Sequence, residues 1–108
     1  MAVHRIAPGV TLDDEDLAVE GVRASGPGGQ NVNKVSSAIA LRLDLDLVVG
    51  MDEAMRARLV ALAGRRVTET GTLVVKAQSH RTQSANRADA VARVVELLRA
   101  ASVAPRAE

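Results

Sequence analysis

Apolar and polar residues alternate most regularly over residues 38–45, which predicts a β-strand. From Ile39 onward every second residue is a large aliphatic one, and the positions between them include Arg42 and Asp44. One face of this strand is therefore expected to pack on a core and the other to face solvent or to be lightly covered. Gly21 lies within another predicted strand, residues 17–24, where a glycine indicates a β-bulge. The further stretches that predict strands are residues 3–6 and 72–78.

A helical period of apolar residues replaces this alternation after residue 50. We expect the helix to begin at Gly50 or Asp52 and to end at Gly64, because glycine is favoured just beyond a helix C-terminus. The apolar stripe that should face the core consists of Met51, Met55, Leu59 and Leu62.

A second helix is predicted from Thr82, a residue type favoured at the N-cap, to about Ala101. Together these elements predict an α+β fold, in which a small, mainly antiparallel β-sheet is packed with two α-helices around one core. The expected buried stripe of the second helix is Ala88, Val91 or Ala92, Val95 and Leu98. The basic residues expected outside this stripe are Arg87, Arg93 and Arg99.

Residues 25–37 separate two predicted strands and are too many for a tight hairpin, and long loops in compact domains are usually functional or disordered. Gly28 and Gly29 lack a Cβ atom, so the backbone there can approach another molecule closely. Gln30 adds a backbone N–H and a side-chain amide that both donates and accepts. A bare glycine pair would be an ordinary turn. The glycine spacing fits neither a dinucleotide fingerprint nor a phosphate-binding P-loop, so both nucleotide sites are excluded.

The chemistry available to this loop is limited by its sequence neighbours, because no carboxylate pair, Ser/His/Asp set or Cys/His pair lies beside it. A glutamine amide does not titrate near neutral pH, so the loop can assist a reaction only through positioning and electrostatics. The chain has no cysteine, and His4 and His80 are isolated from each other. We therefore expect no metal site and no cofactor.

Composition restricts how the chain can bind nucleic acid. Its 108 residues include no Phe, Trp or Tyr, which makes the core aliphatic and excludes base stacking on aromatic side chains. The net charge of +1 is low for an autonomous nucleic-acid binder, so RNA contacts must use a few Arg, Lys, amide and backbone groups. The acidic run at residues 13–16 is expected to be a solvated loop away from RNA. No targeting or membrane-spanning segment is recognisable, which favours a soluble intracellular protein without a membrane partner.

The loop carries a motif that is far more specific than a glycine pair. Residues 25–34 read Ser-Gly-Pro-Gly-Gly-Gln-Asn-Val-Asn-Lys, and the matching motifs around them are Val22–Ala24, Ser36–Ile39, Gln78 and Arg81–Arg87. In this order and spacing they resemble the GGQ domain of class I peptide-chain release factors. The resemblance is strongest to the small codon-independent peptidyl-tRNA hydrolases of the alternative ribosome-rescue factor B subfamily. It implies an N-terminal lead-in at 1–16, a GGQ catalytic domain at 17–101 and a C-terminal stub at 102–108.

The resemblance implies hydrolysis of the peptidyl-tRNA ester in the peptidyl-transferase centre of a stalled ribosome. The implied partners are large-subunit ribosomal RNA and peptidyl-tRNA, and we expect a monomer in the cytoplasm or, alternatively, in the mitochondrial matrix. The implied catalytic residues are Gly28, Gly29 and Gln30, with the backbone N–H of Gln30 donating to the developing oxyanion. The implied RNA-binding residues are Arg23, Ser25, Gly26, Pro27, Asn31, Asn33, Lys34, Arg81 and Arg87.

Two other functions stay open from the sequence: a non-catalytic ribosome- or RNA-binding module of the same fold, and the catalytic domain of a decoding release factor. Gln83 and Asn86 are expected to cap the second helix or to bond to the back of the loop. The rescue subfamily carries a long, basic C-terminal tail, and the present sequence ends with residues 104–108. The sequence is compatible both with truncation where that tail begins and with a relative that lacks the tail. It does not determine which type of stalled ribosome is preferred or whether Gln30 is methylated.

Overall fold

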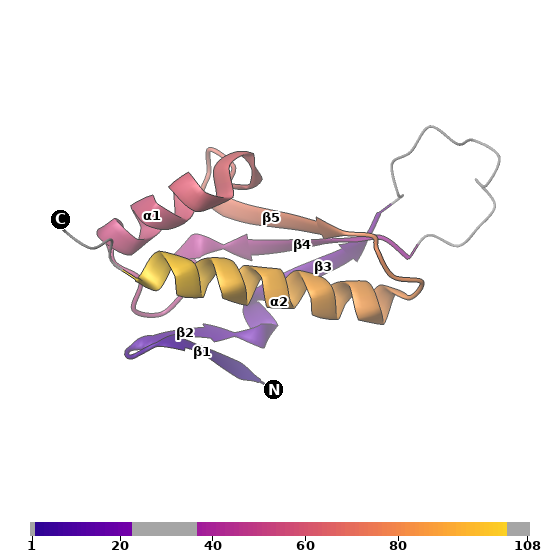
Figure 1. Ribbon diagram of the computed structural model, residues 1–108, viewed down its shortest axis with the longest axis horizontal. Coiled ribbons are helices and arrows are strands. Elements are labelled where there is room, and N and C mark those ends of the chain that lie inside the picture. Colours follow the sequence, from indigo (N-terminus) through magenta and orange to yellow (C-terminus); the bar gives the residue numbers. More distant parts are fainter. Residues whose placement is uncertain (1, 23–36, 104–108) are drawn as a thin grey trace.

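The computed structural model describes residues 2–22 and 37–103. The strands and helices form an α+β domain, which confirms the predicted fold class (Figure 1). In chain order they are β1 (Val3–Ala7), β2 (Val10–Asp13), β3 (Leu17–Gly21), β4 (Ile39–Asp44), α1 (Glu53–Ala63), β5 (Thr72–Ala77) and α2 (Gln83–Ser102). The described helices include none with the length and apolar character that crossing a membrane requires.

The central layer is an antiparallel sheet in the order β3-β4-β5. In β4 the large residues that begin with Ile39 are almost completely buried, as the alternating pattern predicted. Ala40, on the opposite face of the strand, is also only 2% exposed, so at that position this face is covered, which is one of the two predicted alternatives. Lys76 of β5 and Glu20 of β3 are directly opposite Ala40 in the ladder, and their longer side chains flank its methyl group.

Helix α1 starts where the sequence predicted, because the Asp52 side chain caps it by accepting a hydrogen bond from the backbone N–H of Met55 (2.8 Å). The helix ends at Gly64, which has a positive φ of 59°. The predicted stripe is correct for Met55 and Leu59 but wrong for Leu62, which is 49% exposed. Ala63 takes the inward position, because residues four apart lie over one another on a helix.

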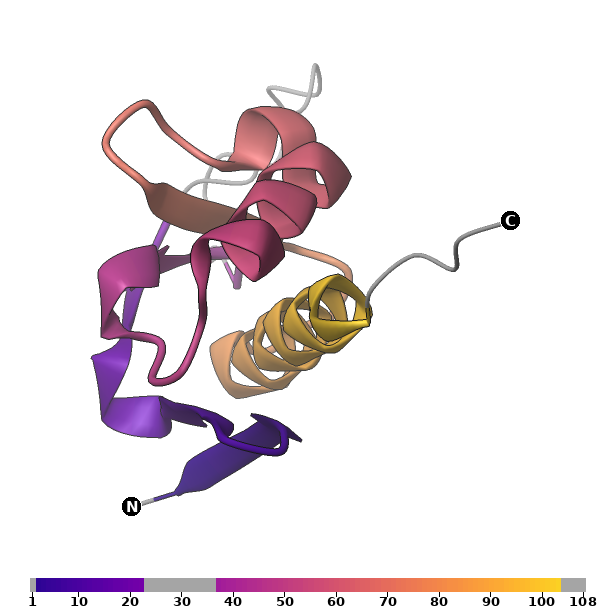
Figure 2. The same cartoon turned by 90° about the vertical axis from the view of Figure 1, so that its left-hand side faces the viewer.

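Helix α2 is capped by Thr82, whose hydroxyl accepts from the backbone N–H of Ala85 (3.1 Å), and this confirms the predicted start. The predicted buried stripe is correct at Leu98, partly correct at Val91 and Val95, which pack against the core, and wrong at Ala88. Ala88 and Ala92 are exposed, and Val91 and Val95 are half-buried. The completely buried positions are Asn86, Ala90, Val94, Leu98 and Ala101. The buried positions differ from the predicted ones because α2 is covered on two sides. The sheet and α1 cover one side and the N-terminal hairpin covers the other, as Figure 2 shows.

That hairpin is formed by β1 and β2, which pair antiparallel apart from the three-stranded sheet. The predicted strand near the N-terminus is confirmed, whereas β2 was not predicted. Residues of the predicted lead-in, among them Ile6, Val10 and Leu12, belong to the hydrophobic core. Thr11 also exchanges two backbone hydrogen bonds with Val49, which ties the hairpin to the segment before α1.

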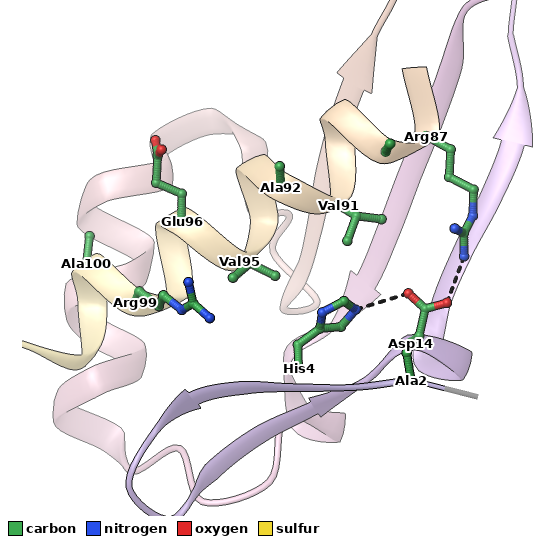
Figure 3. A pocket seen from close by; sticks show the side chains of 11 residues that line it. Ala2, His4, Asp14, Arg87, Val91, Ala92, Val95, Glu96, Arg99 and Ala100 are labelled. Carbon is green, nitrogen blue, oxygen red and sulfur yellow. Dashed lines mark hydrogen bonds and ion pairs between the residues drawn. The ribbon is translucent and has the colours of Figure 1, made fainter. Parts of the chain in front are cut away.

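A groove of about 970 Å³ lies between β1 and α2 (Figure 3). Its apolar floor includes the half-buried Val91 and Val95 of α2. Polar side chains from both elements line its edges, among them His4 of β1 and Arg99 of α2. Arg99 closes one part of the groove by donating to the backbone carbonyl of Arg5 (3.0 Å).

Candidate functional site

The base of the glycine-rich loop is the place where β3 and β4 meet α2 (Figure 1). The backbone N–H of Val22 donates to the carbonyl oxygen of Ala38 (3.0 Å), one step beyond the last ladder pair of Gly21 and Ile39. The loop therefore leaves the sheet from two hydrogen-bonded strand ends. We call the residues at this base, namely Gly21, Val22, Ser37, Ala38, His80, Gln83 and Asn86, the loop stem.

The loop residues themselves lie outside the described part of the chain, which resumes at residue 37. This applies to the predicted catalytic residues Gly28, Gly29 and Gln30. It also applies to the predicted RNA-binding residues Arg23, Ser25, Gly26, Pro27, Asn31, Asn33 and Lys34. Their roles stay predictions.

Asn86 holds the C-terminal side of the loop stem from within the first turns of α2. Its side-chain oxygen Oδ1 accepts from the backbone N–H of His80 (2.9 Å). Its Nδ2 group donates to the carbonyl oxygens of Ser37 (2.7 Å) and His80 (3.1 Å). The Ser37 hydroxyl donates to the same His80 carbonyl (2.8 Å). The prediction that Asn86 bonds to the back of the loop is therefore confirmed, while the backbone role of His80 was not predicted.

Gly21 and Gln83 meet on the N-terminal side of the loop stem. The pairing of β3 with β4 continues without interruption to Gly21, so the predicted bulge is wrong. A Cβ atom on Gly21 would lie 2.6 Å from Nε2 of Gln83, which means that the glutamine amide rests against the bare backbone of this glycine. Glycine is required there by close packing rather than by a break in the strand.

The two predicted RNA-binding residues that the structure describes differ in their surroundings. Arg81 is exposed in the turn before α2 and makes no hydrogen bond or ion pair with any described residue. Arg87 is one helical turn further on, and its Nη2 donates to Oδ2 of Asp14 (2.9 Å). The structure thus places Arg81 next to the loop stem, without a partner among the described residues, and directs Arg87 toward the N-terminal hairpin.

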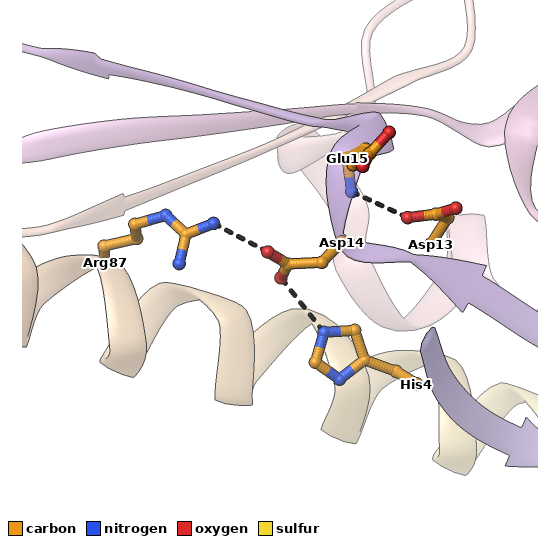
Figure 4. A network of polar contacts seen from close by, with 5 residues as sticks. All are labelled: His4, Asp13, Asp14, Glu15 and Arg87. Carbon is orange, nitrogen blue, oxygen red and sulfur yellow. Dashed lines mark hydrogen bonds and ion pairs between the residues drawn. The ribbon is translucent and has the colours of Figure 1, made fainter. Parts of the chain in front are cut away.

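Asp14 connects three segments of the chain, as Figure 4 shows. Besides Arg87, it accepts a hydrogen bond on Oδ1 from Nε2 of His4 (3.1 Å). The hydrogen bond from His4, followed by that from Arg87, lowers the pKa of the Asp14 carboxyl below its ordinary value of 3.8. The acidic run was predicted to be a solvated loop, and this is wrong for Asp14, which begins a short 3-10 helix and is only 27% exposed.

We expect the Asp14→Asn variant to be less sensitive to acid than the wild-type chain. A lowered folded-state pKa contributes stability that is present above the ordinary value of 3.8 and is lost as pH falls through the folded-state pKa. The variant should therefore be less stable at pH 7 by a few tenths to about 1 kcal/mol, and the difference should shrink as pH falls below 3.8 through the lowered folded-state pKa. Urea denaturation at several pH values measures this, and a difference that does not change with pH contradicts it.

Comparison with known proteins identifies the family of this chain. The RF-1 domain family matches residues 4–108. This chain belongs to the RF-1 domain family. Its relatives include peptidyl-tRNA hydrolase ArfB of Pseudomonas putida, with 49% identity over 96 residues that cover 89% of this chain and 69% of that protein. Large ribosomal subunit protein mL62 of Mus musculus is 32% identical over 90 residues, covering 83% of this chain and 44% of that protein.

This RF-1 domain is also similar to a much longer protein. Peptide chain release factor 1 of Gluconobacter oxydans is 36% identical over 84 residues, which cover 72% of this chain and only 23% of that protein. The resemblance to class I release factors and to the rescue subfamily is therefore confirmed. Within the described residues of the RF-1 domain, no group of three or more acidic, histidine or cysteine side chains could hold a metal ion.

Proposed function

We propose that this chain is a codon-independent peptidyl-tRNA hydrolase that rescues stalled ribosomes. The observation that carries the proposal is the 49% identity to a peptidyl-tRNA hydrolase over 89% of this chain. The loop stem adds a physical reason, because a loop that enters another particle needs a defined base if its tip is to be placed accurately. The proposed partners are the large-subunit ribosomal RNA at the peptidyl-transferase centre and the peptidyl-tRNA, and the proposed form is a monomer.

The proposed reaction is hydrolysis of an ester. The oxygen of a water molecule attacks the ester carbonyl carbon, and the bond to the tRNA ribose oxygen breaks. One proton of that water ends on the ribose oxygen and the other is released to solvent, which leaves a peptide carboxylate and a free ribose hydroxyl. Gly28 and Gly29 let the backbone approach closely, so the backbone N–H of Gln30 can donate to the developing oxyanion. The Gln30 amide orders the water, and the ribosomal RNA and tRNA provide the remaining groups.

Phosphate contacts are proposed for the cationic residues near the loop. Arg81 suits this role because it is exposed at the loop stem and has no partner among the described residues. Arg87 already shares a carboxylate with His4, so an RNA phosphate would have to compete with Asp14 for it. The proposed location is the cytoplasm, which the bacterial relative supports, and the mouse relative supports the mitochondrial matrix as the alternative.

A second candidate function is a non-catalytic module of the ribosome, which is favoured by the similarity to a protein named as a large ribosomal subunit protein. The third, the catalytic domain of a decoding release factor, is supported by the similarity to peptide chain release factor 1. That relative is more than four times as long as the matching segment, so this function would require additional codon-reading domains.

The deciding experiment measures peptide release from ribosomes stalled on a message without a stop codon. We expect the 108-residue chain alone to bind ribosomes weakly and to release peptide slowly, and Gln30→Ala to release at least about 10²-fold more slowly still at equal ribosome binding. A form with a Lys- and Arg-rich segment added after residue 108 should bind more tightly at low salt, because each neutralised phosphate releases counterions. If the wild-type chain and the form with the added basic segment both bind ribosomes but release no peptide, the non-catalytic module is favoured. Release that requires a stop codon would favour the decoding factor.

A further inference from the structure

Asn86 is the one polar residue among the completely buried side chains of the described part of the chain. Burying an amide is costly unless its donors and acceptor all find partners. At Asn86 they do, because Oδ1 accepts one hydrogen bond and Nδ2 donates two, all to backbone groups. A buried amide that is satisfied only by backbone groups fixes the relative position of the segments to which those groups belong.

Asn86 joins two segments: one follows the glycine-rich loop, and the other precedes α2. Ser37 is the first described residue after the loop, and its neighbour Ala38 accepts the hydrogen bond from Val22 on the opposite side. His80 belongs to the turn between β5 and α2, and it also accepts from the Ser37 hydroxyl. The Asn86 side chain therefore fixes Ser37 and His80 relative to the first turns of α2. The opposite side of the loop stem is linked to them through the hydrogen bond from Val22 to Ala38.

Neither helix capping nor core packing explains an asparagine at this position. The N-cap is already Thr82, and the backbone N–H of Asn86 makes the ordinary helical bond to the Thr82 carbonyl (3.1 Å). The same face of α2 continues with Ala90 and Val94, so an apolar side chain would extend that buried stripe equally well. What an apolar residue cannot do is hold Ser37 and His80 at fixed distances.

We propose that Asn86 is a positioning residue for peptidyl-tRNA hydrolysis, which acts by orienting the loop stem and hence the loop that it supports. This inference rests on the proposed function. It predicts that loss of the Asn86 bonds slows the chemical step and leaves ribosome binding intact, because the exposed cationic groups are untouched. A displacement of about 1 Å at a reacting centre can cost about 10²-fold in rate, and we expect an effect of that size.

The test compares Asn86→Leu, Asn86→Ala and the wild-type chain in release from ribosomes stalled without a stop codon. Leucine has the same branched shape with a larger volume, is compatible with the helix and removes every side-chain hydrogen bond. The matched control is Val94→Ala, which truncates a completely buried side chain on the same face of α2 two turns away. All four chains are checked by circular dichroism to be folded at the assay temperature.

We expect both Asn86 variants to lose about 10²-fold in the maximal release rate, with an unchanged half-saturating ribosome concentration, while Val94→Ala retains the wild-type maximal rate. A structural role alone would instead give Asn86→Leu and Val94→Ala the same rate as the wild type whenever they are folded. That result would overturn the inference while leaving the proposed function in place.

An amide spectrum of the ¹⁵N-labelled chain provides a readout that does not depend on activity. Asn86→Leu should shift the backbone resonances of His80, Ser37 and Gln30 and speed hydrogen exchange at the His80 amide, because that N–H loses its acceptor. Val94→Ala should leave them in place. If the wild-type chain releases no peptide, the proposed function fails, and the spectra alone decide: unchanged Gln30 resonances in Asn86→Leu would show that Asn86 does not orient the loop.

Discussion

Replacing Gly28 or Gly29 by alanine lowers the rate of peptide release by about 10²–10³-fold, which is the range expected for Gln30→Ala. The proposed mechanism relies on the backbone N–H of Gln30, which no side-chain substitution deletes. Substituting the preceding glycines is expected to displace this N–H. A Cβ atom at either position restricts the backbone conformation and keeps the chain further from the ester. The two glycine variants should therefore bind stalled ribosomes normally and fail in the chemical step.

Release and binding are measured with the same stalled ribosomes, the first by freed peptide and the second by co-sedimentation. Gly64→Ala is the matched control, because Gly64 ends α1, has a positive φ of 59° and has open space around the position of a Cβ atom. It should lose some stability and retain the release rate of the folded chain. Normal release by both Gly28→Ala and Gly29→Ala would remove the geometric basis of the mechanism.

Gly50→Ala destabilises the whole domain by about 2–5 kcal/mol, because a left-handed backbone costs an alanine about 1–2 kcal/mol and overpacking adds about 1–3 kcal/mol. Gly50 has a φ of +85°, and a Cβ atom there would overlap the carbonyl oxygen of Gly9 and lie 2.9 Å from its carbonyl carbon. Both are backbone atoms of the hairpin turn, so no side-chain rotation relieves the overlap. The neighbouring hydrogen bonds between Thr11 and Val49 would also be strained.

Thermal unfolding checks this result, and a loss of about 10–20 °C in the midpoint is expected for a domain of this size. Gly9→Ala separates the two contributions, because Gly9 has a similar φ of +79° with nothing within 4 Å of a Cβ atom. It should cost only the backbone term of about 1–2 kcal/mol. Equal midpoints for Gly9→Ala and Gly50→Ala would mean that the hairpin moves away from Gly50 without cost.

Local patterns in the sequence were sufficient for the family and for every described α-helix and strand except β2. Alternation in β4 and β5 reflects the two faces of a strand, and Asp52 and Thr82 were recognisable as N-caps, since capping involves residues only three apart. The glycine-rich motif and its flanking residues were likewise contiguous enough to indicate the GGQ domain. The chemistry proposed for Gln30 follows from that motif, because it depends on residue types rather than on distant contacts.

The tertiary structure decided which side of each element is buried and what the polar residues hold. The phase of α2 could not be read from its aliphatic residues, because two surfaces cover the helix and Asn86 continues the buried stripe. The contact of Asn86 with the back of the loop was indicated by the family motif and not by the stripe, in which Asn86 is a polar residue in register with Ala90 and Val94. Asp14 offered no such signal.

The physical reason is the distance along the chain over which the decisive contacts form. Asn86 bonds to Ser37, 49 residues away, and Arg87 bonds to Asp14, 73 residues away. No periodicity or spacing reports such pairs, because they exist only after the sheet, α2 and the hairpin have packed together. The sequence by itself thus determined the family and most of the helices and strands, whereas tertiary packing determined how the residues of the loop stem are arranged.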